Sequence, residues 1–394
     1  MTSAVASGTT IRVSRIERLS DLESLGDEWR QLESLCPDLR VFSTWEWCGA
    51  VVHHFPNQEP LWVFAARDGG DLVGLAPFGR RLEDGLRILR LIGTGLGPYS
   101  VADYQDLLLS DGFEKPTIDS FCAALQELSD GWDVLHLQEV PDSSRTLAPL
   151  VESARARGWR CVQRPGSDVH PLTLSESWEA YCTRLSLKTR RQVERRLRKL
   201  VRERGGEFVY VQDERALEGA MNTLYALHTR RWSAIGKPGI FRTEQRRRFH
   251  QEVARRFHQR GILNLSLLKA DSQVVGASYA FVWNGTDYLY TSGFCPEPEW
   301  SPYGLGTTMD VHEIRTSMAR GLRCVDFLRG DPHYKEHYRA ESRYNRELLV
   351  FRDALTQIRY QTARFARRTA GRLRPLVCLR NRLRSPGIGM EDRP

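Results

Sequence analysis

The sequence predicts an α/β protein with mixed sheets, built as two related domains joined by a basic helix. Segments with strand character alternate with amphipathic helices, which is typical of layered α/β and α+β folds. A strand, a polar turn and a second strand that opens with an aliphatic pair and Gly occur at residues 61–78 and again at 263–283. A repeat spaced by about 200 residues indicates two domains, since solenoid repeats span roughly 20–45 residues.

In the first half, five short apolar runs bounded by turn residues favour strands. They lie at residues 61–66, 72–78, 86–92, 105–109 and 132–137. A helix is expected at 147–157, where Gly158 ends it.

In the second half, six segments favour strands, and two amphipathic helices separate the first strand from the second. The strands are expected at 207–211, 263–269, 274–283, 287–292, 324–328 and 346–351, and the helices at 213–233, 243–259 and 308–320. A basic helix at 177–204 connects the halves. We therefore predict domains at 1–174 and 207–352, a linker helix at 175–206 and an Arg-rich tail at 353–394.

The positive charge of the chain is concentrated in two segments. Its 394 residues carry a net charge of +8, but residues 1–183 carry −11, 184–204 carry +8, 205–350 carry +3 and 351–394 carry +8. The basic helix is either a solvated helix packed between domains or an electropositive wall that steers an anionic donor or nucleic acid. The tail either lies on an anionic membrane surface or extends into solvent as a disordered segment.

Several classes of protein are excluded or disfavoured. The N-terminus has neither a basic region nor an apolar run, which argues against a secretory signal, and no apolar stretch is long enough to span a bilayer. The eight cysteines lie far apart without a C-x-x-C pair, which favours reduced thiols in the cytoplasm and no metal site. Motifs of P-loop NTPases, Rossmann dehydrogenases, zincins and α/β-hydrolases are missing.

A glycine-containing loop between a strand and a helix is the sharpest chemical feature. Gly304 and Gly306 stand where the helix that includes Thr307 begins. Backbone N–H groups and the helix N-terminus suit a phosphate or pyrophosphate there, although the glycines also fit a purely steric turn.

Two further segments carry candidate residues. Residues 326–338 are dense in titratable and aromatic groups and follow a strand, so they suit either a ligand site or a polar surface turn. On the helix at 213–233, His228 and Arg231 fall on or beside the apolar face. There, His228 is either a catalytic residue or a hydrogen-bonded core histidine.

Four motifs in order resemble one family. They are the run 228–232, the loop 301–306, the run 326–330 followed by Tyr334 and Lys335, and the basic stretch after 186–188. Together they are similar to GNAT-superfamily acetyltransferases of the cellulose-biosynthesis-associated CelD type, which are relatives of FemAB-type peptidyltransferases. The resemblance covers most of residues 12–351 and implies tandem GNAT folds, with the acyl-donor site in the second.

The resemblance also implies roles for individual residues. In GNAT enzymes an amine attacks the thioester of acyl-CoA directly. His228 would be the general base, with Asp326 and Asp331 behind it, and Tyr334 would protonate the thiolate, with Tyr338 as its substitute. The acyl donor would bind to Tyr303, Gly304, Leu305, Gly306 and Thr307. The substrate would contact Arg231, Trp232, Arg329 and Lys335, and the three cations among them would neutralise phosphate or an acidic acceptor. The family's phosphate loop carries Gln or Arg three residues before its first glycine, where this sequence has Ser301.

The predicted function is thus transfer of an acyl group from acyl-CoA, without a metal, to an amine of a small molecule or a cell-envelope or polysaccharide precursor. One alternative is a FemAB-like transferase that uses aminoacyl-tRNA held by the basic helix. Another is an inactive GNAT-fold accessory protein of exopolysaccharide synthesis. A cytoplasmic location is expected, with peripheral contact at the inner membrane face through the tail.

Overall fold

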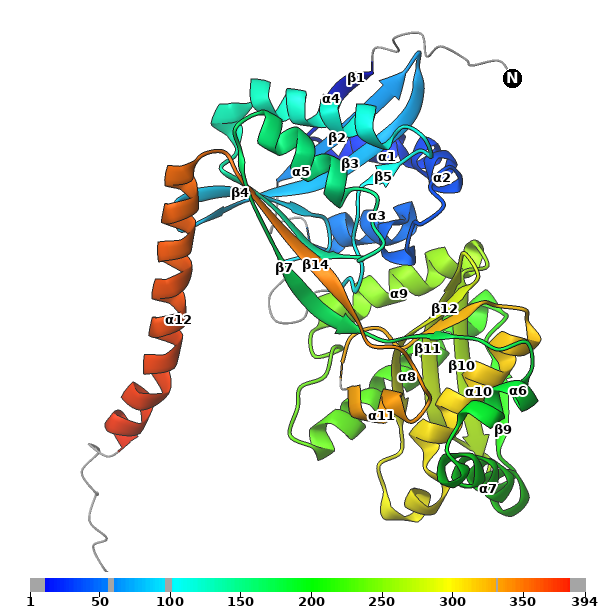
Figure 1. The fold of residues 1–394 in the computed structure, drawn as a ribbon. Helices are drawn as coiled ribbons and strands as arrows, with labels where there is room; N and C mark the ends of the chain where they lie inside the picture. The colour runs from blue at the N-terminus through cyan, green and yellow to red at the C-terminus, as the bar shows by residue number, and fades with distance from the viewer. Residues whose placement is uncertain (1–10, 56–59, 96–100, 331, 383–394) are drawn as a thin grey trace, which may run out of the picture.

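Two mixed β-sheets form the framework of the protein (Figure 1). The computed structural model describes residues 11–55, 60–95, 101–330 and 332–382. Its fold class is the predicted α/β class with mixed sheets. Most of the strands expected from the sequence are present, with boundaries that differ by a few residues.

The first sheet has the strand order β1-β2-β3-β4-β6-β14-β7, with β5 paired to β3. Its pairs are antiparallel except β4 with β6, which is parallel. The strands are β1 (Arg12–Ile16), β2 (Leu61–Asp68), β3 (Asp71–Glu83), β4 (Leu86–Leu91), β5 (Leu108–Leu109), β6 (Val134–Val140), β7 (Arg160–Val169) and β14 (Arg343–Phe351).

Helices cover both faces of the first sheet. They are α1 (Leu19–Ser24), α2 (Gly26–Ser34), α3 (Trp45–His54), α4 (Glu114–Glu127) and α5 (Leu147–Ala156), and short 3-10 turns lie at Val41–Ser43 and Ser129–Gly131. The helices α4 and α5 close a core with Phe64, Phe121 and Trp132. On the other side, α2 and α3 contribute Trp29 and Trp47 to a core that continues into the second half.

The second sheet has the strand order β8-β13-β12-β11-β10-β9. Its strands are β8 (Pro171–Thr173), β9 (Glu207–Tyr210), β10 (Leu263–Ala270), β11 (Gln273–Trp283), β12 (Thr286–Phe294) and β13 (Cys324–Asp326). Its helices are α8 (Glu214–Ala234), α9 (Glu244–Gln259), α10 (Leu305–Ala319) and the short α11 (Pro332–Glu336), and a 3-10 turn spans Pro298–Tyr303. Because Phe249 and Phe257 of α9 share the core of Trp47, the two halves are packed through one continuous apolar interior.

The two halves exchange strands. β14 follows the second sheet in sequence but pairs with β6 and β7 in the first sheet. β8 leaves the first half and pairs with β13 at the edge of the second sheet. The predicted boundaries at 174 and 352 assign β8 to the first domain and β14 to the second. In the structure, each of these strands belongs to the sheet of the opposite half.

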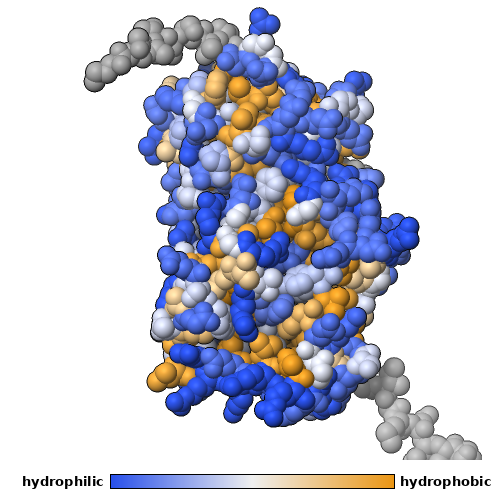
Figure 2. Space-filling view, turned by 90° about the vertical axis from the view of Figure 1, so that its right-hand side faces the viewer, coloured by the Kyte–Doolittle hydropathy of each residue, from blue (hydrophilic) through white to orange (hydrophobic). Residues whose placement is uncertain are grey.

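The connecting segment forms two helices rather than the single helix expected. They are α6 (Trp178–Arg184) and α7 (Leu187–Arg204), and the break falls where the side chain of Ser186 caps the second helix by accepting from the Thr189 N–H. Val193 and Leu200 of α7 are buried, as expected for an amphipathic helix. Figure 2 shows hydrophilic residues along the lower rim of the molecule, the height at which Figure 1 places α7.

The tail continues as a helix, α12 (Ala354–Arg382), which extends away from the two sheets in Figure 1. This replaces the disordered extension considered from the sequence, whose Gly371 and Pro375 favour helix termination. Leu355, Ile358 and Phe365 are exposed along it. Residues 383–394 of the predicted tail lie outside the described residues. Within the described residues, no helix combines the length and hydropathy needed to cross a bilayer.

Candidate active site

The glycine loop lies where the sequence places it, between β12 and α10. Gly304 has φ of 54°, in the left-handed region that favours glycine, and it is the N-cap of α10. Among the described residues, no side chain caps this helix, and its first turn contains no acidic residue. The N–H groups of the first turn therefore face a position suited to an anion.

A guanidinium group from α7 lies against this loop. A Cβ placed on Gly304 would meet the Arg196 guanidinium carbon at 2.8 Å, so only glycine allows this approach. Arg196 Nη1 lies 3.5 Å from the Thr307 hydroxyl. In the amide orientation that satisfies both partners, the Gln192 oxygen accepts from Arg196 at 2.8 Å. The basic linker thus supplies the cation that Ser301 does not.

The loop and Arg196 belong to one cavity of about 640 Å³. The strand β12, the helices α7 and α10, Arg231 of α8 and the segment that begins with α11 supply its walls. Its lining is Thr189, Gln192, Val193, Arg196, Arg231, Ser292, Phe294, Cys295, Pro296, Glu297, Trp300, Ser301, Gly304, Leu305, Gly306, Thr307, Asp310, Tyr334, His337 and Tyr338. Its volume lies within the range of small-molecule sites.

An acidic residue and a tyrosine are paired in this cavity. The Tyr338 hydroxyl donates to Asp310 Oδ2 at 3.0 Å, and Tyr338 is fixed by stacking on Phe327 with 5.2 Å between ring centroids. Desolvation raises the pKa of Asp310 to about 6, although the bond from Tyr338 and the positive charge of Arg231 oppose the shift. A carboxyl group with this pKa is suited to accept a proton near neutral pH.

Arg231 presents a second guanidinium to the cavity. Its Cζ lies 4.2 Å from the centroid of the Phe294 ring. Burial lowers its pKa, partly opposed by Asp310. Among the described residues, none forms a salt bridge with Arg231 within 4.0 Å, so an anionic ligand would provide its counter-charge.

Of the thirteen predicted site residues that the structure describes, seven line the cavity. They are Gly304, Leu305, Gly306, Thr307, Arg231, Tyr334 and Tyr338. Asp331 lies outside the described residues. The side chain of Tyr334 is exposed, and its ring is nearly perpendicular to that of Phe327, with 6.4 Å between the centroids. The other six lie outside the lining.

His228 and Trp232 lie behind the cavity wall. His228 is buried, and neither ring nitrogen has a hydrogen-bond partner among the described residues. Its backbone is packed against Gly293, where a Cβ would meet the His228 nitrogen at 2.4 Å. Desolvation, with a smaller contribution from the charge of Arg231, lowers the pKa of His228 to about 3. Trp232 lies beside it, with 5.7 Å between the rings.

Asp326 and Arg329 contact the first half of the chain instead. Tyr104 donates to Asp326 Oδ2 at 2.6 Å, and the Leu328 N–H donates to its other oxygen. Arg329 forms a partly buried ion pair with Asp103. The parallel pairing of β12 with β13 ends at Tyr288 and Asp326. The first-half segment with Asp103 and Tyr104 lies at the point where these two strands separate.

Lys335 and Tyr303 support the site from outside it. Lys335 is buried and its Nζ donates to the Leu328 carbonyl at 2.9 Å. Tyr303 is buried, accepts from Arg204 and donates to Glu203, which joins the loop to α7.

The sequence did not single out Asp310 or Arg196. Asp310 is four residues after Gly306, so it lies one helical turn farther along the same face of α10. This four-residue spacing from Gly306 is the feature of the sequence that could have identified Asp310 as a site residue. Arg196 was one of many arginines in α7, and only the packing distinguishes it.

Comparisons with known proteins agree with this geometry. Residues 188–336 match the family model described as Acetyltransferase (GNAT) domain. The structure of FemX is similar with a TM-score of 0.61 and 9% identity, covering 88% of this chain and 99% of that one. L-PGS from Bacillus licheniformis gives a TM-score of 0.52 and 10% identity, covering 87% and 96%. The C-terminal domain of a putative lysylphosphatidylglycerol synthetase from Agrobacterium fabrum gives 0.51 and 10%, covering 89% and 97%.

At these identities the likeness concerns the fold alone. It extends over both halves of the chain, and the GNAT domain itself is matched in residues 188–336. A search of curated proteins finds no match.

Proposed function

We propose that the protein transfers an acyl group from an acyl-CoA to an amine of a small molecule or a cell-envelope precursor. The observation that carries this proposal is one cavity that combines an uncapped helix N-terminus, two guanidinium groups and a carboxyl group whose pKa is raised to about 6. The match of residues 188–336 to a GNAT domain supports the same reaction class.

The donor's pyrophosphate would rest on the first turn of α10. The N–H groups of that turn and the Arg196 guanidinium converge there, and charge-assisted hydrogen bonds to phosphate are the strong ones. Arg231 would bind a second anionic group, on the donor or on the acceptor. Trp232, Arg329 and Lys335 were expected to contact substrate; in our proposal they hold the wall around it.

Asp310 would act as the base. An amine of pKa near 10 is about 99.9% protonated at neutral pH, which costs about 4 kcal/mol. Asp310 takes one ammonium proton, the nitrogen lone pair then attacks the thioester carbon, and the C–S bond breaks as the amide forms. Tyr334 protonates the departing thiolate and is reprotonated by the second proton that the nitrogen loses, while the proton on Asp310 passes to solvent. Tyr338 holds Asp310 in place. His228 and Asp326 were expected to carry this chemistry, and their burial outside the cavity favours a supporting role.

Release of free thiol from a panel of acyl-CoAs, with amino sugars and amino acids as acceptors, tests this proposal. Turnover that Asp310→Asn abolishes and His228→Asn preserves would support it. Absence of both turnover and calorimetric CoA binding throughout the panel would overturn it.

Aminoacyl transfer from tRNA is a second candidate, which the fold of FemX and the basic face of α7 favour. Arg191, Arg195 and Arg198 are exposed beside the cavity. This candidate requires salt-dependent tRNA binding that weakens when these arginines are replaced by glutamine.

The accessory role and the CelD-type assignment stay predictions. For either, α12 would provide peripheral contact with an anionic membrane at the cytoplasmic face, because arginines and the exposed Leu355, Ile358 and Phe365 share this helix.

A further inference from the structure

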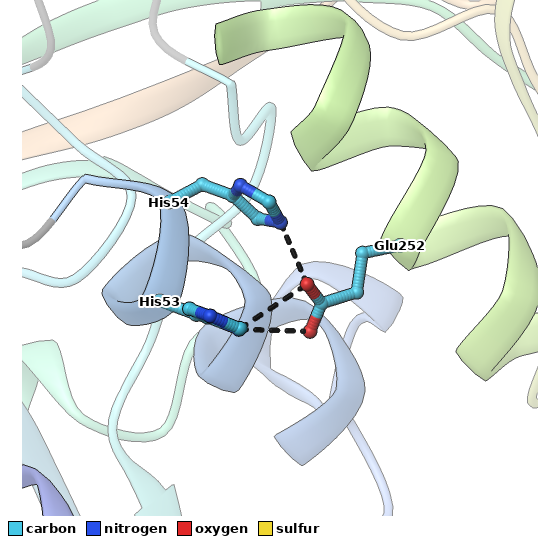
Figure 3. Close-up of side chains that lie close together, drawn as sticks. All are labelled: His53, His54 and Glu252. Carbon is cyan, nitrogen blue, oxygen red and sulfur yellow. Dashed lines mark hydrogen bonds and ion pairs between the residues drawn. The ribbon is translucent and has the colours of Figure 1, made fainter.

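A group of two histidines and one glutamate lies far from the cavity, at the contact between the halves. His53 and His54 are the last two residues of α3, and Glu252 lies on α9. Figure 3 shows both imidazole rings directed at the Glu252 carboxylate. The ligand atoms of these three residues all lie within 4.8 Å of one another.

We propose that His53, His54 and Glu252 bind a divalent transition metal of the zinc class, which links α3 of the first half to α9 of the second. Two imidazoles and a carboxylate match the donor set that such ions prefer, and three protein ligands leave the fourth position open to water. From its widely spaced cysteines the sequence predicted no metal site. Glu252 is about 200 residues from the histidines, and only the fold brings the three residues together.

The distances are close to those of a tetrahedral site. Bonds of about 2.0–2.1 Å place neighbouring ligand atoms about 3.3 Å apart in a tetrahedron. His53 Nδ1 lies 3.3 Å from Glu252 Oε2, and His54 Nε2 lies 2.6 Å from the same oxygen. The two ring nitrogens need to approach by at most about 1.5 Å, which rotation of the exposed His53 ring can supply.

The surroundings hold the ligands in place. Arg256 forms an ion pair with Glu252 Oε1 and so orients the carboxylate, as outer-shell residues do in metal sites. The other oxygen, Oε2, is left for one bond to the metal. The ring of His54 lies against Phe249, and its carbonyl accepts from Gln245 at 2.7 Å.

An adjoining cavity of about 480 Å³ leaves room for water on the metal. Its lining includes His54 and Glu252 together with the charged residues Glu214, Glu218, Arg248 and Arg255.

Titration of the EDTA-treated, dialysed full chain with ZnCl2 in a calorimeter tests the proposal. We expect one equivalent to bind and to raise the unfolding temperature. His54→Ala and Glu252→Gln should each weaken binding at least tenfold and remove the thermal shift. The matched control is His258→Ala, a histidine on the same helix that is not part of the group.

Circular dichroism of the metal-free variants shows whether they fold. If His54→Ala does not fold, His53→Ala decides the matter, because that side chain is 64% exposed and its loss leaves the packing intact. No binding below about 100 μM, or equal affinities in the wild type and all three ligand variants, would overturn the proposal.

Discussion

Arg196→Ala is expected to weaken CoA binding, since its guanidinium lies against Gly304 at the start of α10. A hydrogen bond to a charged group contributes about 1.5–3 kcal/mol. Because 1.4 kcal/mol corresponds to a factor of ten, the dissociation constant should rise about 10- to 150-fold. Isothermal titration of CoA into the purified chain measures this directly.

The same helix offers a matched control. Arg198 also carries one positive charge, but it is exposed and its Nε donates to the Glu194 carbonyl. Arg198→Ala removes only long-range attraction, which salt screens over about 8 Å at physiological ionic strength. Its effect should stay below threefold. If Arg196→Ala and Arg198→Ala weaken CoA equally, the geometry at Gly304 does not determine donor binding and the reasoning fails.

Three other outcomes follow from the structure. Desolvation raises the pKa of Asp310 to about 6, so this carboxyl group is about 90% ionised at pH 7 and about 10% ionised at pH 5. The thiol-release rate should therefore fall about tenfold between pH 7 and pH 5. Asp310→Asn should lower kcat by about 10²–10⁴ and abolish this dependence; an unchanged profile would contradict the assignment. Tyr104→Phe removes the donor to buried Asp326 and should cost about 1–3 kcal/mol in urea denaturation, with a loss under 0.5 kcal/mol refuting the bond. Truncation after Phe351 should abolish sedimentation with anionic vesicles while thiol release persists, and unchanged sedimentation would exclude α12 as the membrane contact.

Local sequence patterns predicted individual helices and strands better than they predicted which of these elements pack or pair together. Gly158 and Gly321 end helices where expected, and Asp213 and Thr243 cap α8 and α9 through their side chains. These features depend on a few neighbouring residues, so they are readable in the sequence. The first-half helices α1, α2, α3 and α4 were not predicted, since none was singled out among the apolar segments around them.

The exchange of β8 and β14 could not be read in the same way. β14 has ordinary strand composition and the short β8 begins with Pro171, but nothing local in either segment states which sheet it will join. The site shows the same limit. The glycine loop is a local motif and was found, whereas the approach of Arg196 and the pairing of Asp310 with Tyr338 depend on how α7, α10 and the segment after α11 pack.

The strand exchange also links the geometry of the cavity to the contact between halves. Tyr334 and Tyr338 lie on the segment between β13, which belongs to the second sheet, and β14, which belongs to the first. Arg329 at the start of that segment is tied to Asp103 of the first half. The tyrosines are thus held from both sides, while Asp310 is fixed by the second half alone. A shift between the halves would therefore change the 3.0 Å bond between Tyr338 and Asp310 and, with it, the basicity of the proposed catalytic carboxylate. In this way the first half, none of whose described residues lines the cavity, would take part in setting the chemistry proposed for the second.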